Sequence, residues 1–133
     1  MLYIDNMLVF LKSIFHVTII ALIILSLYPG SLLGLIFFSD PGLQPTLIKN
    51  PFGSTINHFI AYLYASCMGF FLYFKNKKFI NLVYLMFFLS VVLECFHLII
   101  PNRSFQFSDL IGNILGVLMA YFIIKIYLSF KKS

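Results

Sequence analysis

The chain has 133 residues, of which 62% are hydrophobic, 19% aromatic and only 10% charged, and its mean hydropathy is +1.02. A soluble domain of this length needs far more charge to cover its surface, so the composition excludes one and predicts a polytopic membrane protein. The formal net charge of +5 does not indicate nucleic-acid binding, because the lysines lie in short segments beside apolar runs and form no basic stripe.

The first apolar run, residues 7–28, is expected to be an uncleaved transmembrane helix. Lys12 before an apolar run is also typical of a signal peptide, but no small-x-small cleavage site follows, and the run leads into Tyr28-Pro29-Gly30. His16 lies inside this run, where a lone imidazole more often hydrogen-bonds within the bundle than binds a ligand.

Residues 29–55 form a connection of different character. Its apolar stretch, residues 30–38, is too short to cross a bilayer, which takes about 20 helical residues. Asp40-Pro41-Gly42, Pro45 and Asn50-Pro51 then interrupt any helix. We expect an outer loop that carries a short interfacial or re-entrant segment and is long enough to fold over one end of the bundle.

Three further runs, residues 56–74, 79–100 and 109–128, are each long enough to span a membrane. With the first run they predict an all-α fold, a four-helix membrane bundle that occupies residues 1–133 as a single transmembrane domain. Cys67 and Cys95 both lie within these runs rather than in the outer loops. They are therefore predicted to be packing residues and not a disulfide.

The distribution of basic residues predicts the orientation. One side of the predicted bundle has only Lys49 and Arg103, whereas the other has seven lysines: Lys12, Lys75, Lys77, Lys78, Lys125, Lys131 and Lys132. The positive-inside rule places the lysine-rich side in the cytoplasm. Both termini are then cytoplasmic, and the loops 29–55 and 101–108 face outward.

Polar side chains from four segments converge near the outer face. In a chain this apolar, ionisable groups are costly, so the few that occur indicate where a site lies. Residues spaced by three, four or seven share one face of a helix. By this criterion one face is shared by His58, Tyr62 and Ser66 in the second run, by Glu94 and His97 in the third, and by Asp109, Asn113 and Gly116 in the fourth. Arg103, in the loop between the third and fourth runs, lies near the same end.

Glu94 is the most informative of them. It precedes Pro101 by seven residues, which predicts a position roughly 10 Å below the outer end of its helix. An unpaired carboxylate at that depth costs several kcal/mol or is protonated. It therefore needs a partner, for which Arg103, His97 and His58 are candidates, and an ion pair that only holds the helix ends together is the structural alternative.

The other polar positions also have structural interpretations. Asp109, preceded by Ser108, has the character of a helix N-cap. Gly112 and Gly116 form a GxxxG pair, for which close helix packing is the favoured interpretation. Asn113 is suited to an interhelical hydrogen bond.

This ordered set of motifs resembles the VanZ-like family of small bacterial integral membrane proteins. The resemblance extends over about residues 54–121, and its motifs are His58-Phe59-Ile60-Ala61-Tyr62, Glu94-Cys95-Phe96-His97, Pro101-Asn102-Arg103, Asp109, Asn113 and Gly116. It implies a multi-pass protein of the bacterial inner (cytoplasmic) membrane, linked to the cell envelope and to glycopeptide (teicoplanin) resistance. It does not supply a biochemical mechanism.

Two positions depart from the family pattern. The family often has Asp-Lys before the helix that carries the His, where this chain has Ser54-Thr55. The Gln of the Glu-x-x-Gln motif is replaced by His97. Since an imidazole titrates near neutral pH and binds metals whereas an amide does not, this replacement changes the chemistry available to the site.

Three functions are compatible with these residues. In a binding module, Arg103 and His58 would hold an anionic lipid head group, or a polyprenyl-linked or cell-wall precursor, with Glu94 orienting the Arg. In an enzyme acting on an envelope lipid or glycan, Glu94 or Asp109 would be the general base, His58 or His97 the general acid, and Arg103 would stabilise negative charge. No nucleophile motif is present. As the third function, the chain is an accessory subunit of a larger membrane complex, and the polar cluster only holds the helices together.

The predicted ligand-binding set is His58, Tyr62, Glu94, His97, Arg103, Asp109 and Asn113. His58, Glu94, His97 and Asp109 carry atoms that ligate metals, but there is no second strongly spaced pair, so no metal and no other cofactor is predicted. The expected partners are the lipid bilayer, an anionic or polyprenyl-linked lipid, and a membrane-protein partner or a second copy of the chain.

Overall fold

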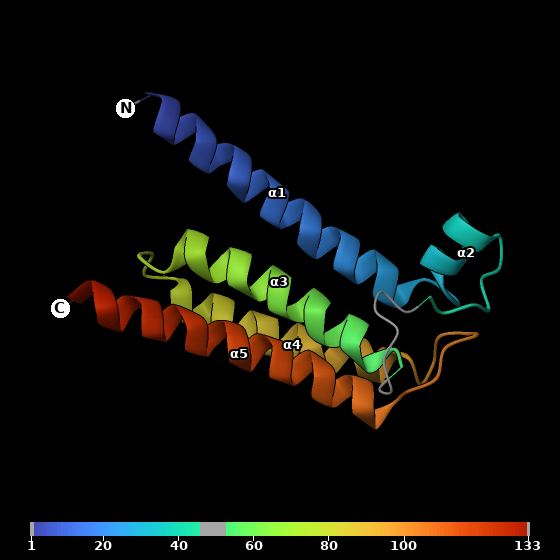
Figure 1. The fold of residues 1–133 in the computed structure, drawn as a ribbon. Coiled ribbons are helices and arrows are strands. Elements are labelled where there is room, and N and C mark those ends of the chain that lie inside the picture. Colours follow the sequence, from blue (N-terminus) through green and yellow to red (C-terminus); the bar gives the residue numbers. More distant parts are fainter. Residues whose placement is uncertain (1, 46–52, 133) are drawn as a thin grey trace.

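The structure is a computed structural model that describes residues 2–45 and 53–132 (Figure 1). In these ranges it has five helices and no strand: α1 (Leu2–Leu27), α2 (Leu32–Phe38), α3 (Thr55–Tyr73), α4 (Phe79–Phe96) and α5 (Phe107–Lys132). All but α2 are long and apolar enough to cross a membrane, as four candidate spans. The predicted all-α fold with four spans is thereby confirmed.

The third span ends earlier than the sequence predicted. Helix α4 ends at Phe96, although the apolar run continues to residue 100. Beyond Phe96 the N–H groups of His97, Leu98 and Ile99 bond to carbonyls three residues back, at 3.0, 3.1 and 3.0 Å. These tight turns precede Pro101, which disfavours a helical conformation in the residue before it.

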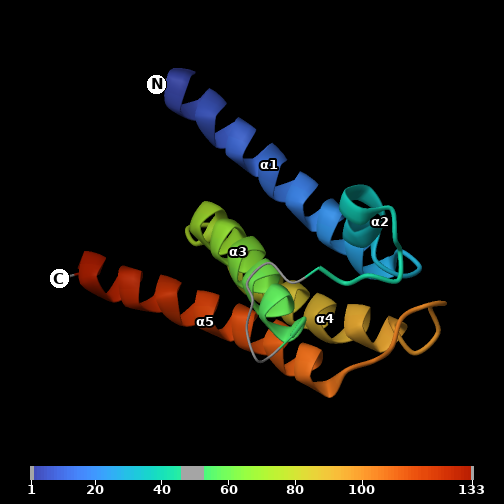
Figure 2. The same cartoon turned by 45° about the vertical axis from the view of Figure 1, so that its right-hand side comes forward.

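Helices α3 and α5 pack against each other along their lengths, with α4 beside both (Figures 1 and 2). Their close approach depends on the GxxxG pair. A Cβ on Gly112 would lie 2.8 Å from the carbonyl oxygen of Thr55, and one on Gly116 would lie 2.6 Å from that of Phe59. The favoured interpretation of these glycines as helix-packing residues is confirmed.

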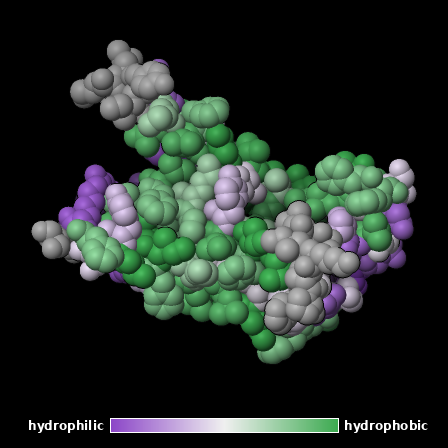
Figure 3. Space-filling model, viewed as in Figure 1, coloured by the Kyte–Doolittle hydropathy of each residue, from purple (hydrophilic) through white to green (hydrophobic). Residues whose placement is uncertain are grey.

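The core lies among α3, α4 and α5. Its fully buried side chains include Phe70 on α3, Met86 on α4, and Val117 and Ile124 on α5. Figure 3 shows mostly hydrophobic atoms along the helices and hydrophilic atoms gathered at the two ends of the molecule. The apolar outer surfaces are those that the hydrocarbon of a bilayer covers.

Helix α1 is the exception to this packing. It diverges from the other long helices toward its N-terminus (Figure 2). In its candidate span only 6% of the most apolar window is buried, compared with 28% to 33% in the other spans. Midway along it, Phe15 is buried against α3, where a Cβ on Gly69 would lie 2.6 Å from its ring.

The connection after α1 contains the short helix α2, which lies near the C-terminal end of α1 (Figure 1). Ser31 caps it by accepting a hydrogen bond from the N–H of Gly34 at 2.9 Å. Ile36, Phe37 and Phe38 are exposed. An interfacial or re-entrant position for this segment stays a prediction, and residues 46–52, which include Lys49, lie outside the described residues.

Both termini lie at the same end of the bundle, as four spans require (Figure 1). Which side of the membrane that end faces stays a prediction.

Both cysteines are free. Cys67 packs against the core, as predicted, but the packing prediction is wrong for Cys95, whose side chain is exposed on the surface of α4.

Replacing Gly116 by Ala tests the α3–α5 contact. The new Cβ would lie 2.6 Å from the Phe59 oxygen and 2.8 Å from the Leu63 nitrogen, both backbone atoms, so the helices must separate. We expect a loss of about 1–3 kcal/mol in unfolding free energy, measured by denaturation in detergent micelles. Gly42→Ala is the control, since its Cβ would come no closer than 3.2 Å to a neighbour. Equal stability of the two variants would contradict this packing.

Candidate functional site

The predicted polar residues meet at the end of the bundle opposite the termini. Here α1 and α4 end, and α3 and α5 begin. Glu94, His97, Asp109 and Asn113 are all buried, and His58 is half-buried. The described side chains include no group of three His, Cys, Asp or Glu arranged to hold a metal ion.

Glu94 lies in the last turn of α4, not about 10 Å below the end of its helix as the sequence predicted, because α4 ends at Phe96. It is nevertheless only 1% exposed. The segment after α4 turns back over it, and the N–H of Gln106 donates a hydrogen bond to Oε1 at 3.1 Å. Burial of this carboxylate therefore comes from the loop rather than from depth along the helix.

Two histidines face the Glu94 carboxylate. Nδ1 of His97 lies 3.2 Å from Oε1, and Nδ1 of His58 lies 3.8 Å from Oε2. Oε2 accepts no hydrogen bond from the described residues. His97 and His58 are thus the partners that the buried charge requires, and Arg103 is not.

Arg103 instead binds the C-terminal end of α1. Its Nη2 donates to the carbonyl oxygen of Leu25 at 2.6 Å, and its Nε donates to that of Tyr28 at 3.2 Å. The last carbonyls of a helix lack intrahelical partners and lie at the negative end of its dipole, so they attract a cation. Partial burial lowers the pKa of Arg103, and the negative charge of Glu94 opposes this effect.

His97 also holds α1, through its second ring nitrogen. Nε2 lies 3.1 Å from the carbonyl oxygen of Ser26. A carbonyl oxygen only accepts, so Nε2 carries a hydrogen and Nδ1 faces Glu94. A hydrogen bond between Nδ1 and Oε1 of Glu94, which lie 3.2 Å apart, requires a proton on one of the two groups.

His58 is held in the same manner between α3 and α5. Asn113 donates its Nδ2 to the carbonyl of Ser90 at 3.2 Å, which turns its Oδ1 toward Nδ1 of His58 at 3.1 Å. The other ring nitrogen, Nε2, lies 3.4 Å from Oδ2 of Asp109. Each histidine therefore has one ring nitrogen beside a neutral acceptor and the other beside a carboxylate.

Asp109 is not the N-cap that the sequence suggested. Its N–H bonds to the carbonyl of Gln106 at 3.0 Å, which places it inside the first turn of α5. Its carboxylate accepts hydrogen bonds from the hydroxyls of Ser54 at 3.0 Å and Thr55 at 2.7 Å. Ser54 and Thr55, noted in the sequence only as a departure from a family pattern, thus attach α5 to the start of α3.

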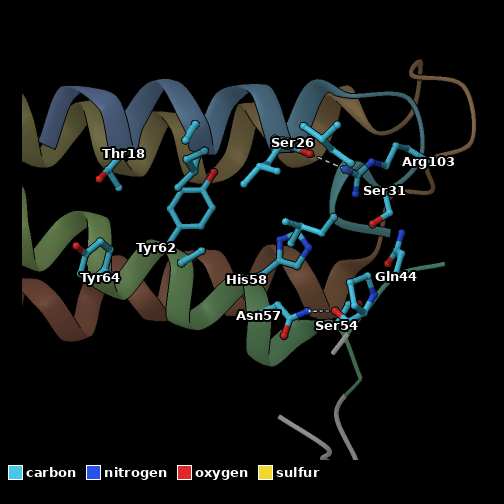
Figure 4. Close-up of a pocket in the computed structure, with 17 residues that line it drawn as sticks. Thr18, Ser26, Ser31, Gln44, Ser54, Asn57, His58, Tyr62, Tyr64 and Arg103 are labelled. Atoms are coloured by element: carbon cyan, nitrogen blue, oxygen red, sulfur yellow. Dashed lines mark hydrogen bonds between the residues drawn. The ribbon is translucent and has the colours of Figure 1, made fainter. Parts of the chain in front are cut away.

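A pocket of about 320 Å³ lies beside this cluster, between α1 and α3 (Figure 4). One end is lined by polar side chains from five segments, namely Ser31, Gln44, Ser54, Asn57, His58 and Arg103. Along α1 and α3 the lining is mostly apolar, with Ala21, Leu22, Leu25 and Ala61, but the hydroxyl residues Thr18, Tyr62 and Tyr64 also line this part (Figure 4). Polar side chains are therefore concentrated at the loop end, and the lining along the helices is mostly apolar.

The structure divides the seven predicted ligand-binding residues into two groups. His58, Tyr62 and Arg103 line the pocket, with the Tyr62 hydroxyl donating to the carbonyl of Leu89 at 3.0 Å. Glu94, His97, Asp109 and Asn113 do not line it and instead hold its walls together. Ser31 and Gln44, beside α2, and Asn57, in the first turn of α3, were missed, because nothing in the sequence distinguishes polar residues that face the pocket from those that face water.

His97→Phe tests whether this cluster holds α1 in place. It keeps a ring but leaves the Ser26 carbonyl and the Glu94 carboxylate without that partner. We expect local opening of the last turns of α1 to become roughly tenfold more frequent, which is about 1.4 kcal/mol, measured by hydrogen–deuterium exchange. His16→Phe is the matched control, since His16 bonds only within α1, to the Lys12 carbonyl. Unchanged exchange in His97→Phe would contradict this role.

Comparison with known proteins supports the family that the motifs suggested. The sequence model of the VanZ/LLP1 family matches residues 4–128, which extends well beyond the motifs that carry the resemblance. Neither the curated proteins nor the solved structures gave a match. Because the family match covers nearly the whole chain, with its four candidate spans, the chain belongs to the VanZ/LLP1 family.

Proposed function

We propose that the protein binds an anionic envelope lipid or polyprenyl-linked cell-wall precursor in the pocket between α1 and α3. The proposal rests on the change from a polar to a mostly apolar lining along the length of the pocket. Polar side chains, including Arg103 and His58, are concentrated at its loop end, and the lining along the helices is mostly apolar apart from the hydroxyl residues Thr18, Tyr62 and Tyr64 (Figure 4). An amphiphile with a charged head group and a hydrocarbon chain matches both ends at once.

The charges around the polar end favour an anion. Arg103 lines the pocket, and the described residues accept from its Nε and Nη2, which leaves other N–H groups of the guanidinium for a ligand. The two carboxylates of the cluster lie behind the pocket wall, each facing a histidine. A guanidinium is well suited to phosphate and carboxylate, which it binds in a bidentate manner.

The proposed setting is the bacterial cytoplasmic membrane, with the polar end of the pocket facing outward. The positive-inside rule supports this orientation, because the described lysines cluster at the end with the termini. In that setting the ligand is a lipid of the outer leaflet. The family resemblance then supports a role in the cell envelope, including glycopeptide (teicoplanin) resistance.

Two variants test the two ends of the pocket separately. Arg103→Gln removes the charge at the polar end, and Ala61→Phe fills the apolar end with a ring from an exposed position on α3. The probes are undecaprenyl phosphate, phosphatidylglycerol and phosphatidylcholine, with binding measured by native mass spectrometry. We expect Arg103→Gln to weaken binding of the anionic lipids about tenfold or more, because a hydrogen bond to a charged group contributes about 1.5–3 kcal/mol.

Ala61→Phe should weaken binding of undecaprenyl phosphate while leaving Arg103 in place. Leu115→Phe, at an exposed position of α5 away from the pocket, is the matched control for the added ring. Lys125→Gln is the control for the removed charge, at the opposite end of the bundle. If Arg103→Gln and Ala61→Phe both bind undecaprenyl phosphate as the wild type does, the ligand does not occupy this pocket.

One observation favours acid–base catalysis on the same ligand as a second candidate function. His58 lines the pocket, and a buried carboxylate, Asp109, faces its Nε2 at 3.4 Å, as in sites where an acid orients a histidine. Incubation of the purified protein with undecaprenyl phosphate-linked precursors, followed by product analysis, distinguishes the two. Recovery of bound but unchanged lipid contradicts catalysis, and product formation that is lost in His58→Gln supports it.

A further inference from the structure

A second cavity, of about 400 Å³, lies on another side of α1, between α1 and α4 and nearer the termini. It shares no lining residue with the first pocket. Its walls are mostly apolar, formed by Phe15, Ile19 and Ile20 of α1 and by Leu82 and Leu85 of α4, and His16 and Asn81 also line it. Helix α1 diverges from the other long helices toward its N-terminus (Figure 1). In a bilayer, a groove beside this part of α1 would be open to the hydrocarbon around the helices.

The rim of this groove is cationic. Lys78, which immediately precedes α4, lines the cavity and is exposed. Lys12 of α1 reaches the same place from the other wall, since its Nζ lies 5.7 Å from the ring centroid of Tyr73, which also lines the cavity. Lys75 and Lys77 lie in the same turn as Lys78.

No carboxylate lines this groove to balance those charges. The chain has four acidic residues in total. Glu94 and Asp109 belong to the cluster at the opposite end, and Asp40 lies in the loop after α2. Asp5 is exposed on α1, seven residues before Lys12 and so about two turns further toward the N-terminus.

We propose that this groove binds one anionic phospholipid from the leaflet at the terminal end of the bundle. Its phosphate would lie between Lys12 and Lys78, and an acyl chain would lie along Ile19, Leu82 and Leu85. The charge of the rim and the mostly apolar lining together match this ligand, since lysines beside a membrane surface attract anionic lipids. The groove and the first pocket are separate, so this site does not depend on the proposed function.

Tryptophan fluorescence tests the proposal directly, because the chain contains no Trp. Leu85→Trp places the only indole in the groove, at a position that is 46% exposed. Tyr84→Trp is the matched control, since Tyr84 is the neighbouring residue and is exposed outside the groove. Each variant is reconstituted in phosphatidylcholine vesicles that contain a small fraction of either brominated phosphatidylglycerol or brominated phosphatidylcholine.

We expect brominated phosphatidylglycerol to quench Trp at position 85 several-fold more than brominated phosphatidylcholine does, and the two to quench equally at position 84. Adding Lys12→Gln and Lys78→Gln should abolish the preference at position 85. Adding Lys125→Gln and Lys131→Gln, which removes the same charge from α5, should preserve it. Ile20→Trp, on the α1 wall of the groove, repeats the measurement if Leu85→Trp reconstitutes poorly.

Equal quenching by the two lipids at position 85 would overturn the proposal. So would an equal effect of the two lysine pairs, because that result indicates a general attraction of anionic lipid to the lysine-rich end. Ala61→Phe, which fills the first pocket without removing a contact of α1, should leave the preference at position 85 unchanged. Failure of this site is therefore distinguishable from failure of the ligand site between α1 and α3.

Discussion

The arrangement of this end of the molecule depends on one buried carboxylate, that of Glu94. A charged group in a bundle this apolar is costly unless protons and N–H groups surround it. The Glu94 carboxylate lies beside the imidazole of His97 and that of His58 on α3, and it accepts a hydrogen bond from the N–H of Gln106 in the loop. The bond from Gln106 holds the loop between α4 and α5 against Glu94. The same loop carries Arg103, which bonds to carbonyls at the end of α1.

The polar residues therefore act mainly through the walls of the pocket. His97 and Arg103 bind the carbonyls that α1 leaves unpaired at its C-terminus, and His58, Asp109 and Asn113 join α3 to α5. Each of these contacts crosses between elements far apart in the sequence. The lining of the pocket comprises one guanidinium, one half-buried imidazole, further polar side chains and a mostly apolar wall along the helices.

Much of this arrangement was predictable from the sequence, for identifiable physical reasons. A span needs about 20 apolar residues, so the four runs predicted the four long helices, and helical spacing placed Glu94 and His97 on one face. The partner of Glu94 could not be chosen from the candidates, because the choice depends on where α4 ends. The hydrogen bonds from Arg103 to the carbonyls of α1 could not be predicted either, because they depend on where the end of that helix lies in the folded structure. The contacts of Asp109 with Ser54 and Thr55 likewise require the register between α3 and α5, which the GxxxG pair indicates only coarsely.

The low burial of α1 links the two cavities to the thickness of the bilayer. Its candidate span has 23 residues, about 34 Å at 1.5 Å per residue, whereas that of α4 has 18, about 27 Å. A hydrocarbon core of about 30 Å accommodates the longer helix by tilting it. Side chains from the loop after α4 hold α1 near its C-terminal end, and little protein packs along the rest, so tilt moves mainly its N-terminal part. Since α1 forms one wall of each cavity, a change in its tilt with membrane thickness would change the width of both.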